Sequence, residues 1–117
     1  MLDGTVITKT SPEMRVVAEE AFAPIVVVEK FSDFEEAIDS SNQTEYGLQA
    51  GVFTQNLSNA KHASENLEYG GVIINDVPTF RVDNMPYGGV KASGFGREGV
   101  RYAMEEMSET RLIVINS

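Results

Sequence analysis

Met85 to Glu98 read MPYGGVKASGFGRE, the most distinctive stretch of this 117-residue chain. The stretch overlaps a longer segment, residues 76–95, that contains two prolines and three glycines and shows no regular hydrophobic period. A loop of that length is uncommon in a compact domain unless it is functional or disordered. The glycines do not form a strand–Gly-x-Gly-x-x-Gly–helix unit, so the stretch is not a dinucleotide-binding fingerprint.

Apolar stretches alternate with helical patterns on both sides of this segment. Runs rich in β-branched residues predict strands at residues 4–10, 25–31, 47–54, 72–75 and 110–115. Apolar residues spaced at i, i+3 and i+4 predict helices at residues 34–42, 57–67 and 97–107. Ser32-Asp-Phe-Glu35 has the capping-box pattern, in which the serine and glutamate side chains each bond a free amide at a helix start. We expect Gly70-Gly71 to end the second helix.

This order of elements predicts an α/β fold with a mostly parallel sheet and covering helices. A parallel sheet is buried on both faces, yet the chain offers only about three helices to cover it. We therefore expect the chain to be a fragment of a larger domain.

The composition excludes several function classes. The net charge is −9, from 18 acidic and 9 basic residues, and this argues against a nucleic-acid partner. Residues 81–117 carry equal numbers of acids and bases, so this part has no acid excess to repel an anionic ligand. The longest apolar run, residues 25–28, is too short to span a membrane, and the N-terminus lacks a signal-peptide pattern. The chain has no cysteine, which excludes disulfides and favours the cytoplasm.

Two familiar kinds of catalytic or binding site can be set aside. His62 is the single histidine and lies among polar residues of a predicted helix, so we expect a surface position and no Ser-His-Asp catalysis. The acid pairs at residues 35–36 and 105–106 are adjacent in sequence, and adjacent side chains point apart on a helix. These acids are therefore expected to be solvated, and no metal site is predicted.

Four segments together resemble the aldehyde dehydrogenase superfamily, in the order and at about the spacing of that family. The first, Glu19-Glu-Ala-Phe-Ala-Pro24, is similar to the family's Glu-x-Phe-Gly-Pro signature. The others are residues 44–54, 71–75 and 86–98. The resemblance covers nearly the whole chain. It implies that residues 1–107 are the C-terminal part of the catalytic domain and that residues 108–117 form a terminal oligomerisation strand.

The resemblance implies an enzyme that oxidises a small aldehyde to a carboxylic acid with NAD or NADP. In the family a cysteine thiolate attacks the aldehyde, hydride passes to the nicotinamide, and a glutamate activates water to release the acid. The family's cysteine, its glutamate base and its dinucleotide-binding domain precede the matched segments. Since this chain has no cysteine, we expect it to be inactive alone and to bind no cofactor by itself.

Two residues are implied at the cofactor. Glu20 matches the glutamate that holds the nicotinamide ribose, and a carboxylate accepts two hydroxyl protons well. Phe22 matches an aromatic residue packed against the nicotinamide end. The alternatives are a surface acid beside Glu19 and a core aromatic. Ala23 stands where the family usually has glycine, and alanine disfavours positive φ, so the backbone there can differ.

The residues implied on the substrate side lie in and after the long loop. Phe80 and Arg81 match one wall of the family's aldehyde tunnel, and Tyr87 replaces a more usual phenylalanine. A guanidinium there would favour an aldehyde that carries a carboxylate, phosphate or sulfonate; the alternative is an ion pair with nearby Asp83. Glu98 matches a glutamate proposed to relay protons, and its alternative is an acid stabilised by the helix dipole.

The last predicted strand implies self-association. In the family this strand adds to a sheet that crosses between subunits, so we expect a homo-oligomer. A hydrophobic strand with unpaired edges is also a liability when exposed. Other functions stay open: a non-catalytic oligomerisation or binding module, one subunit of a split dehydrogenase, or an unrelated domain that binds small molecules.

Overall fold

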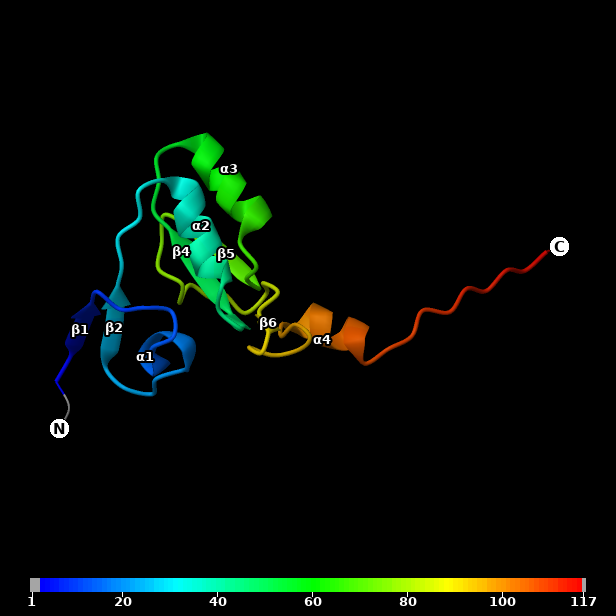
Figure 1. Ribbon diagram of the computed structural model, residues 1–117. Coiled ribbons are helices and arrows are strands. Elements are labelled where there is room, and N and C mark those ends of the chain that lie inside the picture. The colour runs from blue at the N-terminus through cyan, green and yellow to red at the C-terminus, as the bar shows by residue number, and fades with distance from the viewer. Residues whose placement is uncertain (1–2, 117) are drawn as a thin grey trace. The chain divides into compact units, whose positions relative to one another are not determined.

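The computed structural model describes residues 3–116, which form two compact units that meet in sequence between Glu45 and Tyr46. Each unit combines short strands with helices (Figure 1). Among the described residues, two of the three strand pairs are parallel and the third is antiparallel. The α/β class and the mostly parallel pairing predicted from the sequence are therefore confirmed.

The first unit is built around one parallel strand pair. It contains β1 (Thr5–Thr8), α1 (Arg15–Ala18), β2 (Ile25–Val28) and α2 (Phe34–Asn42). Strands β1 and β2 run in register from Thr5 opposite Ile25 to Thr8 opposite Val28. Both strands are shorter than predicted, and the helical turn α1 was not predicted. A four-residue helix is too short for a periodic pattern to identify it.

The cap of α2 differs from the prediction by one residue. The N-cap is Asp33, whose Oδ1 accepts the backbone N–H of Glu36 at 2.9 Å. The Glu36 carboxylate reaches back and accepts the backbone N–H of Ser32 at 2.7 Å and its hydroxyl at 2.5 Å. These hydrogen bonds hold the pKa of Glu36 below its usual value. The reciprocal cap is therefore present, with Asp33 and Glu36 in place of Ser32 and Glu35.

The second unit contains β3 (Tyr46–Gly47), β4 (Gln49–Val52), α3 (Leu57–Asn66), β5 (Gly71–Ile74), β6 (Val90–Lys91) and α4 (Val100–Glu106). Helix α3 connects the parallel strands β4 and β5, which pair from Gln49 opposite Gly71 to Val52 opposite Ile74. The helix contacts β5, and its Ala63 is completely buried. The long loop predicted at residues 76–95 is interrupted by β6, which pairs antiparallel with β3.

Helix ends in the second unit depart from the prediction in two places. Helix α3 ends at Asn66 with Leu67 as its C-cap, and Gly71 begins β5 instead of ending the helix. Helix α4 begins at Val100 after Gly99, whose φ of 109° lies outside the helical region, and not at Arg97. Only glycine adopts such a φ readily, so it sets the helix start.

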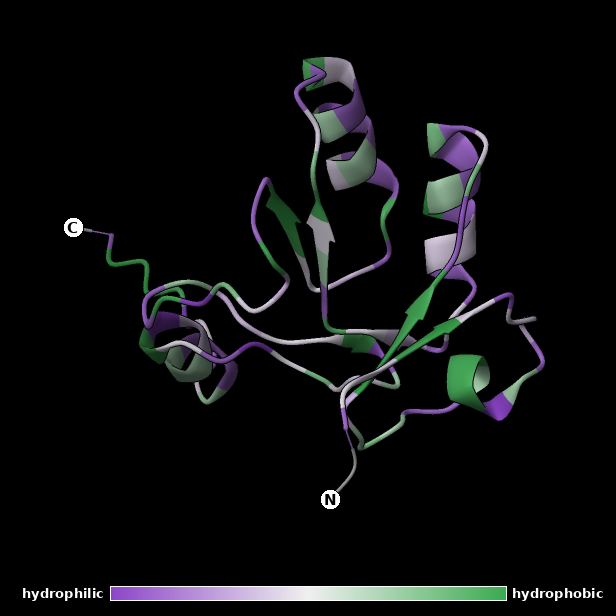
Figure 2. Ribbon diagram, turned by 90° about the vertical axis from the view of Figure 1, so that its left-hand side faces the viewer, coloured by the Kyte–Doolittle hydropathy of each residue, from purple (hydrophilic) through white to green (hydrophobic). Residues whose placement is uncertain are grey.

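The strand predicted at residues 110–115 is not formed within this chain. After α4 the described residues continue as an extended segment without a paired strand beside it (Figure 1). The segment is mostly hydrophobic (Figure 2). Its four apolar residues Leu112, Ile113, Val114 and Ile115 are 71–87% exposed. A strand needs a neighbour to complete its hydrogen bonds, and the described part of this chain supplies none here.

Very little apolar surface is fully covered. Within residues 3–116, the buried hydrophobic side chains are Ile38, 4% exposed, and Ala63, 0% exposed. Large apolar residues in β1, β2 and α4 remain open to solvent, which is what a fragment of a larger core would show. In the described part of the chain, no helix is long and apolar enough to cross a bilayer.

Candidate functional site

The candidate site lies in the second unit, in the loop that follows β5. The loop begins at Asn75, which has a φ of 61° and whose Oδ1 accepts the backbone N–H of Thr54 at 2.8 Å. Asparagine tolerates this left-handed conformation better than most residues, and its side chain ties the end of β5 to Thr54, two residues after β4. Farther along, the carbonyl of Phe80 accepts a hydrogen bond from the side chain of Gln49 at 3.1 Å. The loop is therefore anchored to the parallel strand pair.

The loop folds back on itself at Tyr87 and Glu98. The two residues form an antiparallel bridge: Tyr87 N–H donates to the Glu98 carbonyl at 3.2 Å, and Glu98 N–H donates to the Tyr87 carbonyl at 2.6 Å. This bridge places the two ends of the stretch that opens at Met85 side by side. Their side chains can then act on a common partner.

That partner is Arg81. Its Nη2 lies 2.7 Å from Oε2 of Glu98, and its guanidinium carbon lies 4.4 Å from the centre of the Tyr87 ring. A salt bridge on one side and a cation–π contact on the other hold the guanidinium in place. Three of the residues implied on the substrate side therefore meet in one cluster. The side chains of Arg81 and Glu98 are 48% and 65% exposed, so the cluster is open to a ligand.

The geometry bears on two alternatives considered from the sequence. The carboxylate paired with Arg81 is Glu98, 17 residues away, and not Asp83. Glu98 also precedes the Gly99 cap of α4, and the first turn of that helix has no acid. Glu98 therefore lies one residue before the cap and outside the first turn, and the contact that its carboxylate makes is with Arg81.

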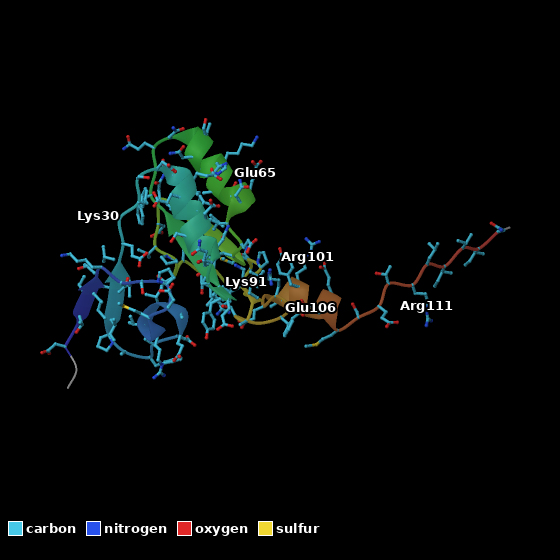
Figure 3. All side chains as sticks on the ribbon, viewed as in Figure 1. Lys30, Glu65, Lys91, Arg101, Glu106 and Arg111 are labelled. Carbon is cyan, nitrogen blue, oxygen red and sulfur yellow. The ribbon has the colours of Figure 1, made fainter. Side chains whose placement is uncertain are left out.

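Sequence reasoning missed a second set of contacts, around Arg97. Its Nη1 donates to the carbonyls of Gly89 at 3.0 Å and Gly96 at 2.7 Å, and its backbone N–H donates to Oε1 of Glu106 at 2.8 Å. Glu106 projects from α4, as does Arg101 (Figure 3). Glu106 is exposed, as expected for an acid on a solvated face, and it accepts this hydrogen bond in addition. The adjacent Glu105 does lie on an exposed face, where it pairs with Arg101 at 2.9 Å.

The two residues implied at the cofactor belong to the other unit. Glu20 is exposed, and Phe22 is 95% exposed, so neither side chain is buried by the described residues of this chain. Around them the backbone turns tightly, with Ala23 N–H donating to the Ala21 carbonyl at 2.8 Å. Ala23 has no positive φ, so alanine fits there without strain.

The remaining titratable candidates do not assemble into a site. His62 is half-buried on α3, where its carbonyl accepts a hydrogen bond from the Asn66 side chain at 2.8 Å, so the expected surface position is only partly correct. Within residues 3–116, no group of three histidine or acidic side chains could hold a metal ion.

Comparison with known proteins identifies the family. The model of the aldehyde dehydrogenase family matches residues 1–113. The lactaldehyde dehydrogenase of Methanococcus aeolicus is 52% identical over 98 residues, which are 84% of this chain and 21% of that protein. The 3-sulfolactaldehyde dehydrogenase of Priestia megaterium is 47% identical over 112 residues, which are 96% of this chain and 24% of that protein.

Solved structures of aldehyde dehydrogenases also match this chain. Aldehyde dehydrogenase 21 from Physcomitrella patens, in complex with the reaction product succinate, superposes with a TM-score of 0.89 at 51% identity over 94% of this chain and 23% of its own. Glyceraldehyde-3-phosphate dehydrogenase from Methanocaldococcus jannaschii, complexed with NADP, superposes with a TM-score of 0.80 at 47% identity over 89% of this chain and 22% of its own. The chain spans between a fifth and a quarter of the length of these proteins. It belongs to the aldehyde dehydrogenase family.

Proposed function

We propose that this chain is the C-terminal part of the catalytic domain of an NAD(P)-dependent aldehyde dehydrogenase, the enzyme class that oxidises an aldehyde to a carboxylic acid. The observation that carries the proposal is the superposition on a solved aldehyde dehydrogenase with a TM-score of 0.89 over 94% of the chain. Residues 1–107 would belong to the catalytic domain, and residues 108–117 to the terminal oligomerisation strand.

The chemistry assigned to this enzyme class cannot be completed by this chain alone. It requires a thiolate nucleophile, and the 117 residues include no cysteine. We infer that the chain is inactive in isolation. In the complete enzyme it would contribute Glu20 and Phe22 to the nicotinamide end of NAD or NADP. Their chemistry fits that role, because a carboxylate accepts ribose hydroxyls and an exposed aromatic ring can pack on the nicotinamide. A relative solved with NADP supports the cofactor class.

The substrate class proposed is a small aldehyde that carries an anionic group. Arg81 supports this proposal, because its guanidinium has five N–H donors, is about half exposed, and is held in a fixed orientation by Glu98 and Tyr87. One relative is named for 3-sulfolactaldehyde, which carries a sulfonate, and another is solved with its reaction product succinate, which carries two carboxylates. Phe80, 45% exposed, would line the same wall beside Arg81, and Glu98 would take part in proton relay.

A hybrid enzyme tests the proposal. In it, this chain replaces the matching 112-residue segment of the Priestia megaterium 3-sulfolactaldehyde dehydrogenase. We expect the hybrid to reduce NAD or NADP when it is given 3-sulfolactaldehyde, and the isolated chain to show no turnover. The Priestia protein without that segment is the matched control and should be inactive. A folded hybrid without turnover would overturn the proposed function, and turnover by the chain alone would overturn its dependence on the missing part.

A second candidate function is oligomerisation without catalysis. The observation that favours it is the exposed hydrophobic segment Leu112–Ile115, which has the composition of a strand but no paired strand among residues 3–116. Such a segment would add to a sheet of another subunit. Light scattering on the isolated chain, with and without residues 112–117, would detect this association separately from any catalysis.

A further inference from the structure

We propose that Glu106 is a positioning residue for the candidate substrate site: its carboxylate holds the Gly96–Arg97 turn, and through that turn it fixes Glu98 and Arg81. The inference rests on the proposed function, because the site it serves is the one assigned there to the aldehyde. It is carried by a series of contacts from α4 to the loop.

The first contact joins α4 to the turn. Oε1 of Glu106 accepts the backbone N–H of Arg97 at 2.8 Å, across nine residues. The same carboxylate lies over Gly96, where an added Cβ would come within 2.7 Å of Oε2. Gly96 has a φ of 74°, which glycine adopts at little cost. The carboxylate therefore occupies space that a side chain at residue 96 would otherwise take.

The second contact joins the turn to the other side of the loop. The Arg97 side chain donates to the carbonyls of Gly89 and Gly96, so it connects the two segments of the loop in which these glycines lie. The backbones are in close contact there, because a Cβ added to Gly88 would come within 2.5 Å of the Gly96 carbonyl oxygen. A shift of the turn would therefore displace residues 88–89 as well.

The third contact joins the turn to Arg81 in the candidate substrate site. Glu98 follows Arg97 directly, and its two backbone hydrogen bonds to Tyr87 fix the direction of its side chain toward Arg81. A carboxylate and an aromatic ring then orient the guanidinium. The carboxylate that contacts Arg81 is that of Glu98, and Glu106 acts on it through the backbone of the turn.

The neighbouring Glu105 provides a matched control. It has the same charge on the same helix, but its carboxylate pairs with Arg101, and the two side chains are 59% and 80% exposed. An effect of charge or of helix propensity alone would appear equally in both positions. An effect through the loop would appear at Glu106 alone.

The test uses Glu106→Ala, Glu106→Gln and Glu105→Ala in the hybrid enzyme and in the 117-residue chain. In the hybrid, Glu106→Ala should raise the KM for 3-sulfolactaldehyde about tenfold, or about 1.4 kcal/mol, while the KM for a neutral aldehyde stays within about twofold. Glu106→Gln keeps an oxygen acceptor for the Arg97 N–H and should restore most of the parent KM. Glu105→Ala should leave both KM values unchanged.

Amide exchange in the 117-residue chain provides a readout that does not depend on catalysis. Glu106→Ala should speed exchange at the amides of both Arg97 and Glu98, and Glu105→Ala should not. The positioning role is refuted if Glu106→Ala and Glu105→Ala show the same amide exchange at Glu98 and the same KM for 3-sulfolactaldehyde. If the parent hybrid lacks activity, the proposed function fails, and the Glu98 amide alone supports or overturns the positioning role.

Discussion

Replacing Arg81 with alanine separates a binding role from a structural one. The Arg81–Glu98 pair is about half exposed, and exposed pairs contribute roughly 0–1 kcal/mol because water screens them. The contact with Tyr87 adds on the order of 0.5–1 kcal/mol at an exposed site. We therefore expect the free energy of unfolding to fall by only about 1 kcal/mol, since Glu98 can be rehydrated once its partner is gone.

The expected effect on binding is larger. A hydrogen bond to a charged group is worth about 1.5–3 kcal/mol. Its loss should therefore raise the KM for an anionic aldehyde about tenfold to a hundredfold in the hybrid enzyme. Arg81→Lys should lie between the parent and alanine, because an ammonium keeps the charge and loses the planar fork.

The assay compares two aldehydes of equal length, one with a sulfonate or carboxylate and one neutral, by steady-state reduction of NAD or NADP. Arg101→Ala is the matched control, because that guanidinium also pairs with a glutamate but lies on the exposed face of α4. If Arg81→Ala changed the two KM values by the same factor, or changed neither, recognition of the anionic group by Arg81 would be refuted.

Three further predictions concern the rest of the chain. Ser32→Ala should raise the pKa of Glu36 toward its usual value, and an NMR titration of that carboxyl would measure the change. Because the folded pKa is lowered, the stability that Glu36 contributes is present above the ordinary glutamate pKa and is lost as pH falls through the folded pKa. An unchanged Glu36 pKa would contradict the hydrogen bond from Ser32 as the cause. Gly70→Ala should destabilise the second unit by about 1–3 kcal/mol in urea unfolding, since an added Cβ would come within 1.7 Å of the Gly88 carbonyl oxygen. Gly4→Ala is the control and should be nearly neutral, because nothing lies within 4 Å of its added Cβ. Equal urea midpoints for the two variants would argue against the close contact at Gly70. Leu112→Asp with Val114→Asp should lower the mass measured by light scattering at high concentration, and a parent chain that is already a clean monomer would contradict association through this segment.

The elements that the sequence predicted are those whose signals are local. The β-branched run at residues 25–28 and the helical periods of α2 and α3 each lie within about ten residues. Strands β3 and β6 were not predicted as a pair because each has two residues and their register depends on chain folding between residues 47 and 90. The strand at residues 110–115 has the right composition, but pairing requires a partner that composition does not supply.

The candidate site was predicted in part for the same reason. Arg81, Tyr87 and Glu98 were singled out by their positions in a family pattern, but that pattern does not say which of them touch. Asp83 was the nearer acid in sequence, yet the guanidinium pairs with Glu98 because the Tyr87–Glu98 bridge brings that residue back to it. Glu106 was missed because its role depends on a turn nine residues earlier that no local rule places beside the helix.

The scarcity of buried apolar side chains also sets how this chain should respond to heat and denaturant. With Ile38 and Ala63 as the fully covered hydrophobic residues among those described, unfolding would bring little new apolar surface into water. The heat-capacity increment should then fall well below the value of about 1.2–1.5 kcal/mol/K found for a domain of 100 residues. The denaturant m-value, which scales with the same newly exposed area, should be small as well, and melting of the isolated chain should be broad. Both quantities should rise together in the hybrid enzyme if, as proposed, the rest of a catalytic domain covers these strands and helices.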